Sequence, residues 1–272
     1  KFNRVLAKMY RSVGQGINNH EALFGLMDKI NVMPGDLAGG KIQELVTNRV
    51  DEASIKYKGR MMSQEGIIDD KAREIFGKRW KRQMRKFQSM TDDTFKIDLR
   101  DSERTLSQGE MAYLYNQFKD PGLHPTFENM LGENYSNIIK DLESKLNPQL
   151  KEWADWQVNE YFPSVYNHYN DTYKKIYRTD MPFNEHYAGR IFREGVDSNK
   201  PLDLLGEASI YQTSIAPGST KVRNKDANND ILPMDINRAL LSYVQDMEYF
   251  AAYAEPMRDI NNCLLYTSDA AD

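Results

Sequence analysis

The sequence predicts an all-α fold, an elongated multi-helix bundle with one irregular, loop-rich arm at about residues 179–233. Three observations lead to this prediction. Apolar residues recur at intervals of three and four along most of the chain, which is the spacing of one helix face. Capping residues and helix breakers divide this pattern into helix-sized pieces. The arm alone loses the period and is rich in Pro, Gly, Asn and Asp, which favour turns.

The composition is typical of a globular protein. Hydrophobic residues make up 40% of the 272 residues and charged residues 28%, a balance that excludes a disordered tail. No apolar run is long enough to cross a bilayer, so we expect no transmembrane segment. Cys263 is the only cysteine, which excludes disulfides and cysteine zinc sites from the chain before it. The net charge of −4 indicates that the surface as a whole is no electrostatic trap for nucleic acid.

Four helices are predicted in the first hundred residues. Phe2, Leu6, Met9 and Val13 share one face of the first helix. A second helix over 20–30 ends before a Pro- and Gly-rich loop, and a third covers 41–58. The fourth runs roughly from Gln64 to Met90, and its apolar face contains Ile67, Ile68, Ala72, Ile75, Phe76, Trp80, Met84 and Phe87.

A capping box marks the next helix start. In it, the Ser107 hydroxyl and the Glu110 carboxylate each bond a backbone N–H that the helix leaves unpaired. The helix that this box opens ends before Pro121, and a short helical turn starts at Thr126.

A long helix is expected to begin at Asn134. Pro148 should kink or divide it, because proline lacks the N–H donor and crowds the preceding turn. Another helix follows Pro163, and the arm has one short helix near 201–208. The final helix covers about 234–262, and its apolar face contains Ile236, Leu240, Val244, Met247, Phe250 and Ala254, widened by Tyr243, Tyr249 and Tyr253.

We therefore expect a helical region at 1–100, a helical domain at 101–262 that includes the arm and the long C-terminal helix, and a tail at 263–272. The tail, CLLYTSDAAD, has neither a helical period nor a cap. All of its residues match the translation of a transposon adapter used in sequencing libraries, so we interpret it as an adapter artefact. The chain also starts without Met inside a helical pattern, so both ends are expected to be cuts in a longer reading frame.

The densest charge feature is the segment KRWKRQMRKF at 78–87. Trp80, Met84 and Phe87 are spaced as one helix face, and six basic side chains surround them. Such a helix can neutralise the phosphates of a nucleic acid or lie on an anionic membrane. The alternative is a core-packed helix whose basic outer face pairs with acidic segments elsewhere.

A second basic cluster lies in the arm, where backbone N–H groups near Gly218 and Ser219 can also contact phosphate. Its structural alternative is an ion pair between Arg223 and a neighbouring carboxylate. The candidate nucleic-acid-binding residues are Lys78, Arg79, Lys81, Arg82, Arg85, Lys86, Lys221 and Arg223.

The sequence contains no catalytic motif. His20, His124, His168 and His186 lie far apart and form no HExxH pair, and neither a GxSxG elbow nor a Walker pattern occurs. We therefore expect no catalytic residues, no metal and no cofactor. The enzymatic alternative is a site around 185–194, formed by His186, Arg190, Arg193 and Glu194.

Two stretches carry a resemblance to a known family. NEYFPSVYNHYNDTYKKIYRTDMPFNEHYAGRIFREG and TKVRNKDANNDILPMDINRALLSYVQDMEYFAAYAEPMRDINN resemble helical domains of the large polyvalent proteins of phages and mobile elements. The resemblance covers about Leu106–Asn262. It implies a non-enzymatic structural or interaction module of a large virion or mobile-element protein, located in the virion or host cytoplasm. Other domains of the parent polypeptide, virion proteins and DNA are the partners it implies, and nucleic-acid binding by 78–86 is the alternative function.

Overall fold

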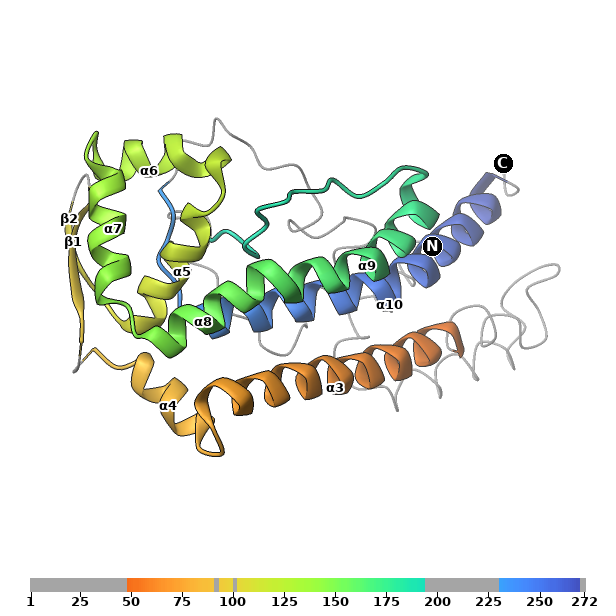
Figure 1. The fold of residues 1–272 in the computed structure, drawn as a ribbon. Coiled ribbons are helices and arrows are strands. Elements are labelled where there is room, and N and C mark those ends of the chain that lie inside the picture. Colours follow the sequence, from red (N-terminus) through yellow and green to blue (C-terminus); the bar gives the residue numbers. More distant parts are fainter. Residues whose placement is uncertain (1–47, 91–92, 100–101, 194–229, 270–272) are drawn as a thin grey trace.

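The computed structural model describes residues 48–90, 93–99, 102–193 and 230–269, the last ten of them as backbone only. Long helical rods lie side by side in this part of the chain (Figure 1). They are α3 (Arg49–Phe76), α10 (Ile236–Asp269), and a composite rod of α8 (Pro148–Trp156), the π-helical turn η4 (Gln157–Tyr161) and α9 (Phe162–Tyr177). The prediction of a mainly α-helical bundle is confirmed for the described residues.

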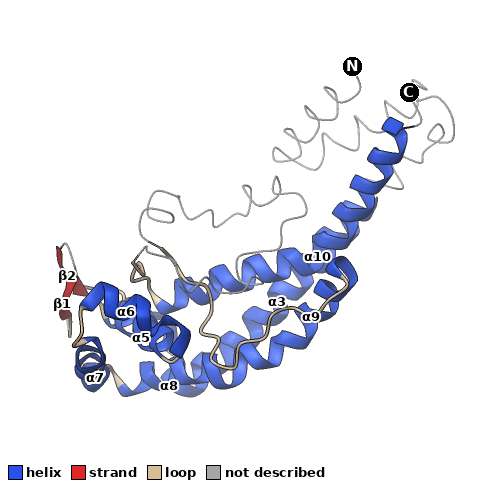
Figure 2. Cartoon of the chain, turned by 90° about the horizontal axis from the view of Figure 1, so that it is seen from above, coloured by secondary structure: helices blue, strands red, loops and turns tan. Residues whose placement is uncertain are grey.

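A second group of elements covers one end of the rods (Figures 1 and 2). It consists of α4 (Trp80–Phe87), β1 (Phe95–Leu99), β2 (Ser102–Leu106), α5 (Gln108–Phe118), the 3₁₀ turn η3 (Pro121–Leu123), α6 (His124–Leu131) and α7 (Tyr135–Lys145). Helix α5 lies at the centre of this group and packs against α7, α8 and α10.

The predicted capping box and the predicted effect of Pro148 are confirmed. The Ser107 side chain accepts from the Glu110 backbone N–H, and Glu110 accepts in return from the Ser107 N–H at 2.9 Å. Pro148 divides the predicted long helix instead of kinking it. Asn147 caps α8 by accepting from the N–H groups of Gln149 and Leu150, so proline takes the first helical position, where its missing N–H costs nothing.

The predicted boundaries of the helices over 41–58 and from Gln64 to Met90 are wrong. Helix α3 runs without a break from Arg49 to Phe76, so it joins the described part of the first predicted helix to the second, and α4 is a separate helix. Gly77 causes the break: its φ of 76° lies in the left-handed region, which only glycine adopts without strain. The prediction also placed Ile67 on the core face, but its side chain is 48% exposed.

A β-hairpin at 95–106 was not predicted. Its antiparallel strands pair Phe95 with Leu106 and Leu99 with Ser102. Phe95 and Ile97 are buried while Lys96 and Asp98 are exposed, so β1 does alternate, but over only five residues. The predicted domain boundary after residue 100 falls between these two paired strands.

The core is built from aromatic and aliphatic side chains contributed by all three rods. Trp153 stacks on Trp156 at 4.8 Å between ring centroids and meets Phe76 edge-on at 5.9 Å. The predicted apolar face of the last helix is confirmed: Ile236, Tyr243 and several residues between and beyond them are buried. The backbone of α10 stays helical to Asp269, past the predicted end at Asn262.

The described parts of the arm, 179–193 and 230–233, contain no helix, as predicted. The first part runs as an extended strap beside α9 (Figure 2). An isolated β-bridge joins Arg193 to Ile231, so the two parts meet. Residues 194–229, with the helix predicted near 201–208, lie outside the described residues.

Candidate nucleic-acid interface

Helix α4 is held at a sharp corner after α3. The N–H of Gly77 bonds the Arg73 carbonyl at 2.8 Å and closes the last turn of α3. The N–H of Trp80 then bonds the Gly77 carbonyl at 3.1 Å, so the chain turns directly into α4. These backbone bonds fix the orientation of α4 relative to α3, because they leave few backbone torsions between the two helices free to rotate.

The apolar face of α4 is anchored in the core, as its spacing predicts. Met84 is buried, and Trp80 and Phe87 are partly buried against the core. The Phe87 ring lies 5.9 Å from that of Phe76. Asn237 of α10 donates to the Met84 sulfur at 3.3 Å, so α4 is also tied to the far end of the chain.

The outer face of α4 and the two residues before it are basic. Lys78, Arg79, Lys81, Arg82, Arg85 and Lys86 are all exposed. Among the described residues, no carboxylate lies within ion-pair distance of any of these six. Two of these side chains contact other groups within α4. Lys81 Nζ lies 5.2 Å from the Trp80 ring centre, and Arg85 Nε donates to the Lys81 carbonyl at 3.3 Å.

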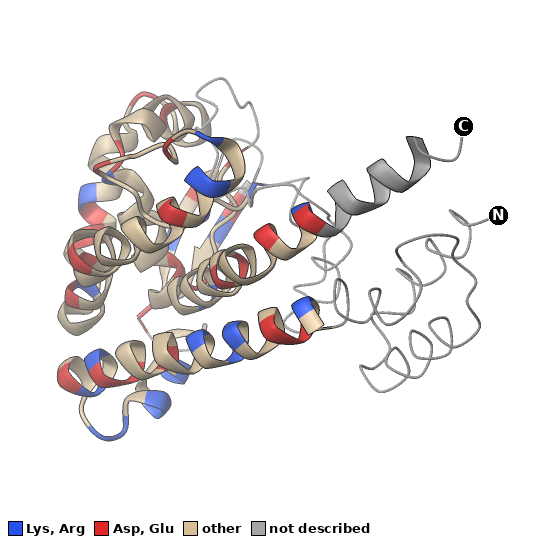
Figure 3. Cartoon of the chain, turned by 90° about the vertical axis from the view of Figure 1, so that its right-hand side faces the viewer, with Lys and Arg blue, Asp and Glu red and all other residues tan. Residues whose placement is uncertain are grey.

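The sequence around this patch contains no acidic residue between Glu74 and Asp92. The carboxylates at the end of α3 are already paired, Glu74 with Lys71 at 2.9 Å and Asp69 with Arg73 at 2.5 Å. Figure 3 shows the resulting concentration of Lys and Arg at the corner beneath α3. The six charges therefore form one positive surface in a protein whose net charge is −4.

The second predicted basic cluster, Lys221 and Arg223, lies outside the described residues, as does Glu194. The structure places the other arm candidates apart. His186 is exposed, and its backbone N–H bonds the Asn184 side chain at 3.0 Å. Arg190 instead turns toward α10, where it pairs with Asp246 at 3.0 Å and bonds Ser242. Arg190 thus fastens the strap to α10.

A buried polar cluster around Glu248 was not predicted from the sequence. Glu248 of α10 is fully buried and accepts from Gln64 of α3 and Tyr169 of α9, each at 3.0 Å. Tyr161, in the π-helical turn η4, donates to Gln64 at 2.8 Å. A lone glutamate within an apolar helix face gives no periodic signal, so only the folded arrangement reveals this cluster.

The second carboxylate oxygen of Glu248 faces two basic groups. Arg60 Nε lies 3.9 Å away and His168 Nε2 3.8 Å away, while Arg60 and His168 contact each other at 3.1 Å. Burial raises the pKa of Glu248, but His168, Tyr169 and Arg60 outweigh that effect and hold the pKa below its usual value. The cluster therefore holds an ionised carboxylate between α3, α9 and α10.

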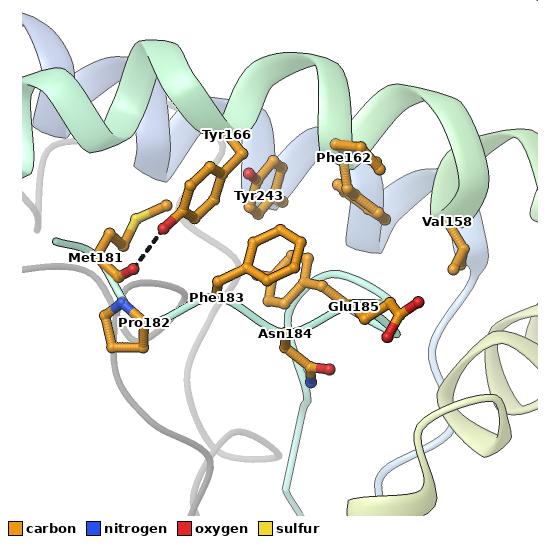
Figure 4. Close-up of a pocket in the computed structure, with 11 residues that line it drawn as sticks. Val158, Phe162, Tyr166, Met181, Pro182, Phe183, Asn184, Glu185 and Tyr243 are labelled. Atoms are coloured by element: carbon orange, nitrogen blue, oxygen red, sulfur yellow. Dashed lines mark hydrogen bonds between the residues drawn. The ribbon is translucent and has the colours of Figure 1, made fainter.

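An apolar groove lies between α9 and the strap (Figure 4). Phe162, Tyr166 and Phe183 line it, and the Tyr166 hydroxyl closes one end by donating to the Met181 carbonyl at 2.5 Å. Asn184 and Glu185 supply its only polar side chains besides the tyrosine hydroxyls. Glu185 and Tyr187, within the 185–194 segment of the enzymatic alternative, line this groove, but His186 and Arg190 do not.

No cluster of three or more His, Cys, Asp or Glu that could hold a metal occurs in the described part of the chain. Within the same residues, no helix is both long and apolar enough to span a bilayer. In comparisons with protein families, curated proteins and solved structures, nothing matches this chain.

Proposed function

We propose that this chain is a helical interaction module that binds nucleic acid through the outer face of α4 and the corner before it. One observation carries the proposal. Six exposed cations at Lys78–Lys86 lie on α4 and the corner before it, the other face of α4 is fixed in the core, and no described carboxylate neutralises these cations. Basic clusters of this kind gain affinity for nucleic acid, because their binding releases the counterions that condense on the phosphates.

The anchoring of α4 favours nucleic acid over a membrane. A helix that lies on a bilayer inserts its apolar face between lipids. Here that face packs on the protein core, because Met84 is only 5% exposed and Phe87 packs on Phe76. Only the charged face is available to a partner, which suits phosphates at the surface of a duplex or a single strand.

The length of α4 favours contacts to the backbone over reading of base sequence. Its eight residues span about 12 Å at 1.5 Å per residue, little more than two turns. The exposed side chains are lysine and arginine, the residues that most often contact phosphates. We therefore expect binding with little preference for base sequence. The rigid α3–α4 corner would hold the basic side chains in position for the phosphates.

The test is fluorescence anisotropy with labelled duplex and single-stranded DNA at low salt. Replacing Arg82 and Arg85 by Glu should weaken binding by roughly a hundredfold or more, because two attractive contacts become repulsive. The matched control replaces Lys56 and Lys140 by Glu, which changes the net charge equally on exposed helix positions away from α4. The control should bind like the parent chain. Equal loss in both variants would show a general charge effect and overturn the proposal.

The wider assignment rests on the resemblance of residues 106–262 to large polyvalent proteins of phages and mobile elements. Placement in such a protein, in a virion or the host cytoplasm, would give the module DNA and virion proteins as partners. The bundle supports a scaffold role: its interior polar groups at Glu248 and Arg190 are used to tie helices and strap together. The phage origin, the adapter origin of 263–272 and the enzymatic alternative at 185–194 stay predictions.

A further inference from the structure

Helix α3 carries an apolar stripe on the side that faces away from the core. Ile55 is 70% exposed and Met62 is 73% exposed. Gly59 and Gly66 alternate with them, at successive spacings of four, three and four residues, so that all four lie on one helix face. The buried Gln64 belongs to the opposite face.

The two glycines have no packing role among the described residues. A Cβ atom added to Gly59 or to Gly66 would meet nothing within 4 Å. Glycine in a helix interior disfavours the helix relative to alanine, so these positions weaken α3 without a benefit inside the monomer. What they provide is a notch in the helix surface, which lets the side chains of another helix approach its backbone closely.

We propose that this stripe is the contact surface between two copies of the chain, with their α3 helices antiparallel about a two-fold axis between residues 60 and 61. In that register Ile55 of one copy lies opposite Gly66 of the other, and Met62 lies opposite Gly59. Each large apolar side chain therefore meets a notch, four times along the contact. Closed two-fold contacts of this kind use the same patch on both subunits.

The stripe is complementary to itself, so the partner that fits it is a second copy of the chain. The order large, glycine, large, glycine becomes its own complement only when the partner helix is reversed. One pair of charges beside the stripe agrees with this register. Lys58 and Glu65 are exposed, and neither forms an ion pair with another described residue. In the proposed register each Lys58 lies within about 3 Å, along the axis, of Glu65 of the second copy.

The contact should be weak and reversible. A single helix face contributes less area than the ~1,200–2,000 Å² that stable interfaces bury. Acidic residues also meet at each end of the contact, Glu52 of one copy near Asp70 of the second and Asp51 near Asp69, which is repulsive. The dimer should therefore form as concentration rises. Dimerisation does not depend on the charges of α4, so it is a property separate from the proposed nucleic-acid binding.

Cysteine cross-linking of the whole chain tests the register, with Cys263→Ser as the background. Oxidising a mixture of the Ile55→Cys and Gly66→Cys variants should give a disulfide-linked dimer. Each variant alone should stay uncross-linked, because its own cysteines would lie 11 residues, about 16 Å, apart along the paired helices. A disulfide needs Cα atoms within about 7 Å. Cross-linking of each variant with itself, or none in the mixture, would overturn the proposal.

Analytical ultracentrifugation over a concentration series tests the association itself. Replacing Ile55 and Met62 by Lys should weaken dimerisation by roughly tenfold or more, since charges would be buried at the contact. Ile67→Lys, at an exposed position off the stripe, is the control and should dimerise normally, and circular dichroism should show all variants folded. A chain that is monomeric throughout overturns the proposal. If its Ile55→Cys thiol is also shielded from alkylation, the stripe is covered by the same chain.

Discussion

Gly109 shows how a single residue can fix the contact of two helices. A Cβ at this position in α5 would lie 2.1 Å from Oδ2 of Asp235. That carboxylate cannot move away freely, because its other oxygen accepts from the backbone N–H groups of Asn237 and Arg238, both at 3.1 Å, at the start of α10. The glycine is therefore needed where α5 approaches the α10 cap.

We expect Gly109→Ala to lower the free energy of unfolding by about 1–3 kcal/mol, through overpacking or loss of the cap. Gly66→Ala is the matched control, because its added Cβ meets nothing. It should raise the free energy of unfolding of the monomer by up to about 1 kcal/mol. Urea denaturation at low protein concentration measures both. If Gly109→Ala left the free energy of unfolding unchanged, the α10 cap would tolerate displacement.

Glu248 gives the fold a dependence on pH. Its pKa is lower in the folded chain than the reference value of 4.5, which approximates the unfolded chain. The ionised carboxylate therefore stabilises the fold above about pH 4.5, and this contribution is lost as pH falls through the folded-state pKa. We expect the free energy of unfolding to decrease on acidification over that range, as measured by urea denaturation at a series of pH values.

Glu248→Gln isolates this contribution. The amide keeps the shape of the side chain but removes the charge that faces Arg60 and His168. We expect a loss of roughly 1–3 kcal/mol at pH 7 and a smaller loss in acid, where the parent carboxyl is itself protonated. A variant that loses the same amount at every pH would show that Glu248 acts through shape and hydrogen bonding alone.

At the scale of elements, the corner between α3 and α4 decides where the basic face points. Gly77 adopts a φ of 76° there, and an added Cβ would meet no neighbour, so only backbone strain opposes a side chain. We expect Gly77→Ala to cost about 1 kcal/mol of unfolding free energy and to weaken DNA binding by displacing α4. Thermal unfolding and anisotropy on the same samples measure both. Weakened stability with unchanged binding would show that the corner does not orient the site.

The elements that sequence predicts best are those whose signals are local. The Ser107–Glu110 box and the division at Pro148 depend on side chains adjacent to the backbone they bond. The break at Gly77 was missed because glycine is tolerated inside helices, and two flanking apolar patterns happened to remain in phase. The hairpin at 95–106 was missed because five residues alternate too briefly to define a period.

For the candidate site, too, sequence predicts the local features and misses the tertiary contacts. The basic and apolar faces of α4 follow from residue spacing, and the structure confirms that Met84 faces the core and Arg82 faces outward. That no described carboxylate pairs with these cations depends on tertiary arrangement and could not be predicted. The cluster around Glu248 joins residues from three helices, among them Arg60 and Glu248, which are 188 positions apart, and no local pattern indicates such a contact.

At the scale of the whole molecule, charge is unevenly distributed. The net charge is −4, yet the corner at Lys78–Lys86 carries six cations that no carboxylate of the described residues pairs with. A net negative protein that binds nucleic acid must do so through a local surface, and the rest of the molecule should repel the polymer. Binding should therefore be confined to one orientation, with α4 toward the phosphates.

The dependence of DNA affinity on salt tests the central claim most directly. If the α4 face neutralises phosphates, log K for duplex DNA should fall against log salt with a slope of about −3 to −5, set by the six available cations. Replacing Arg79, Arg82 and Arg85 by Glu should abolish binding in the same titration, while Lys56→Glu with Lys140→Glu leaves the slope unchanged. Binding that persists in the triple variant with its slope intact would contradict the assignment of α4 as the nucleic-acid interface.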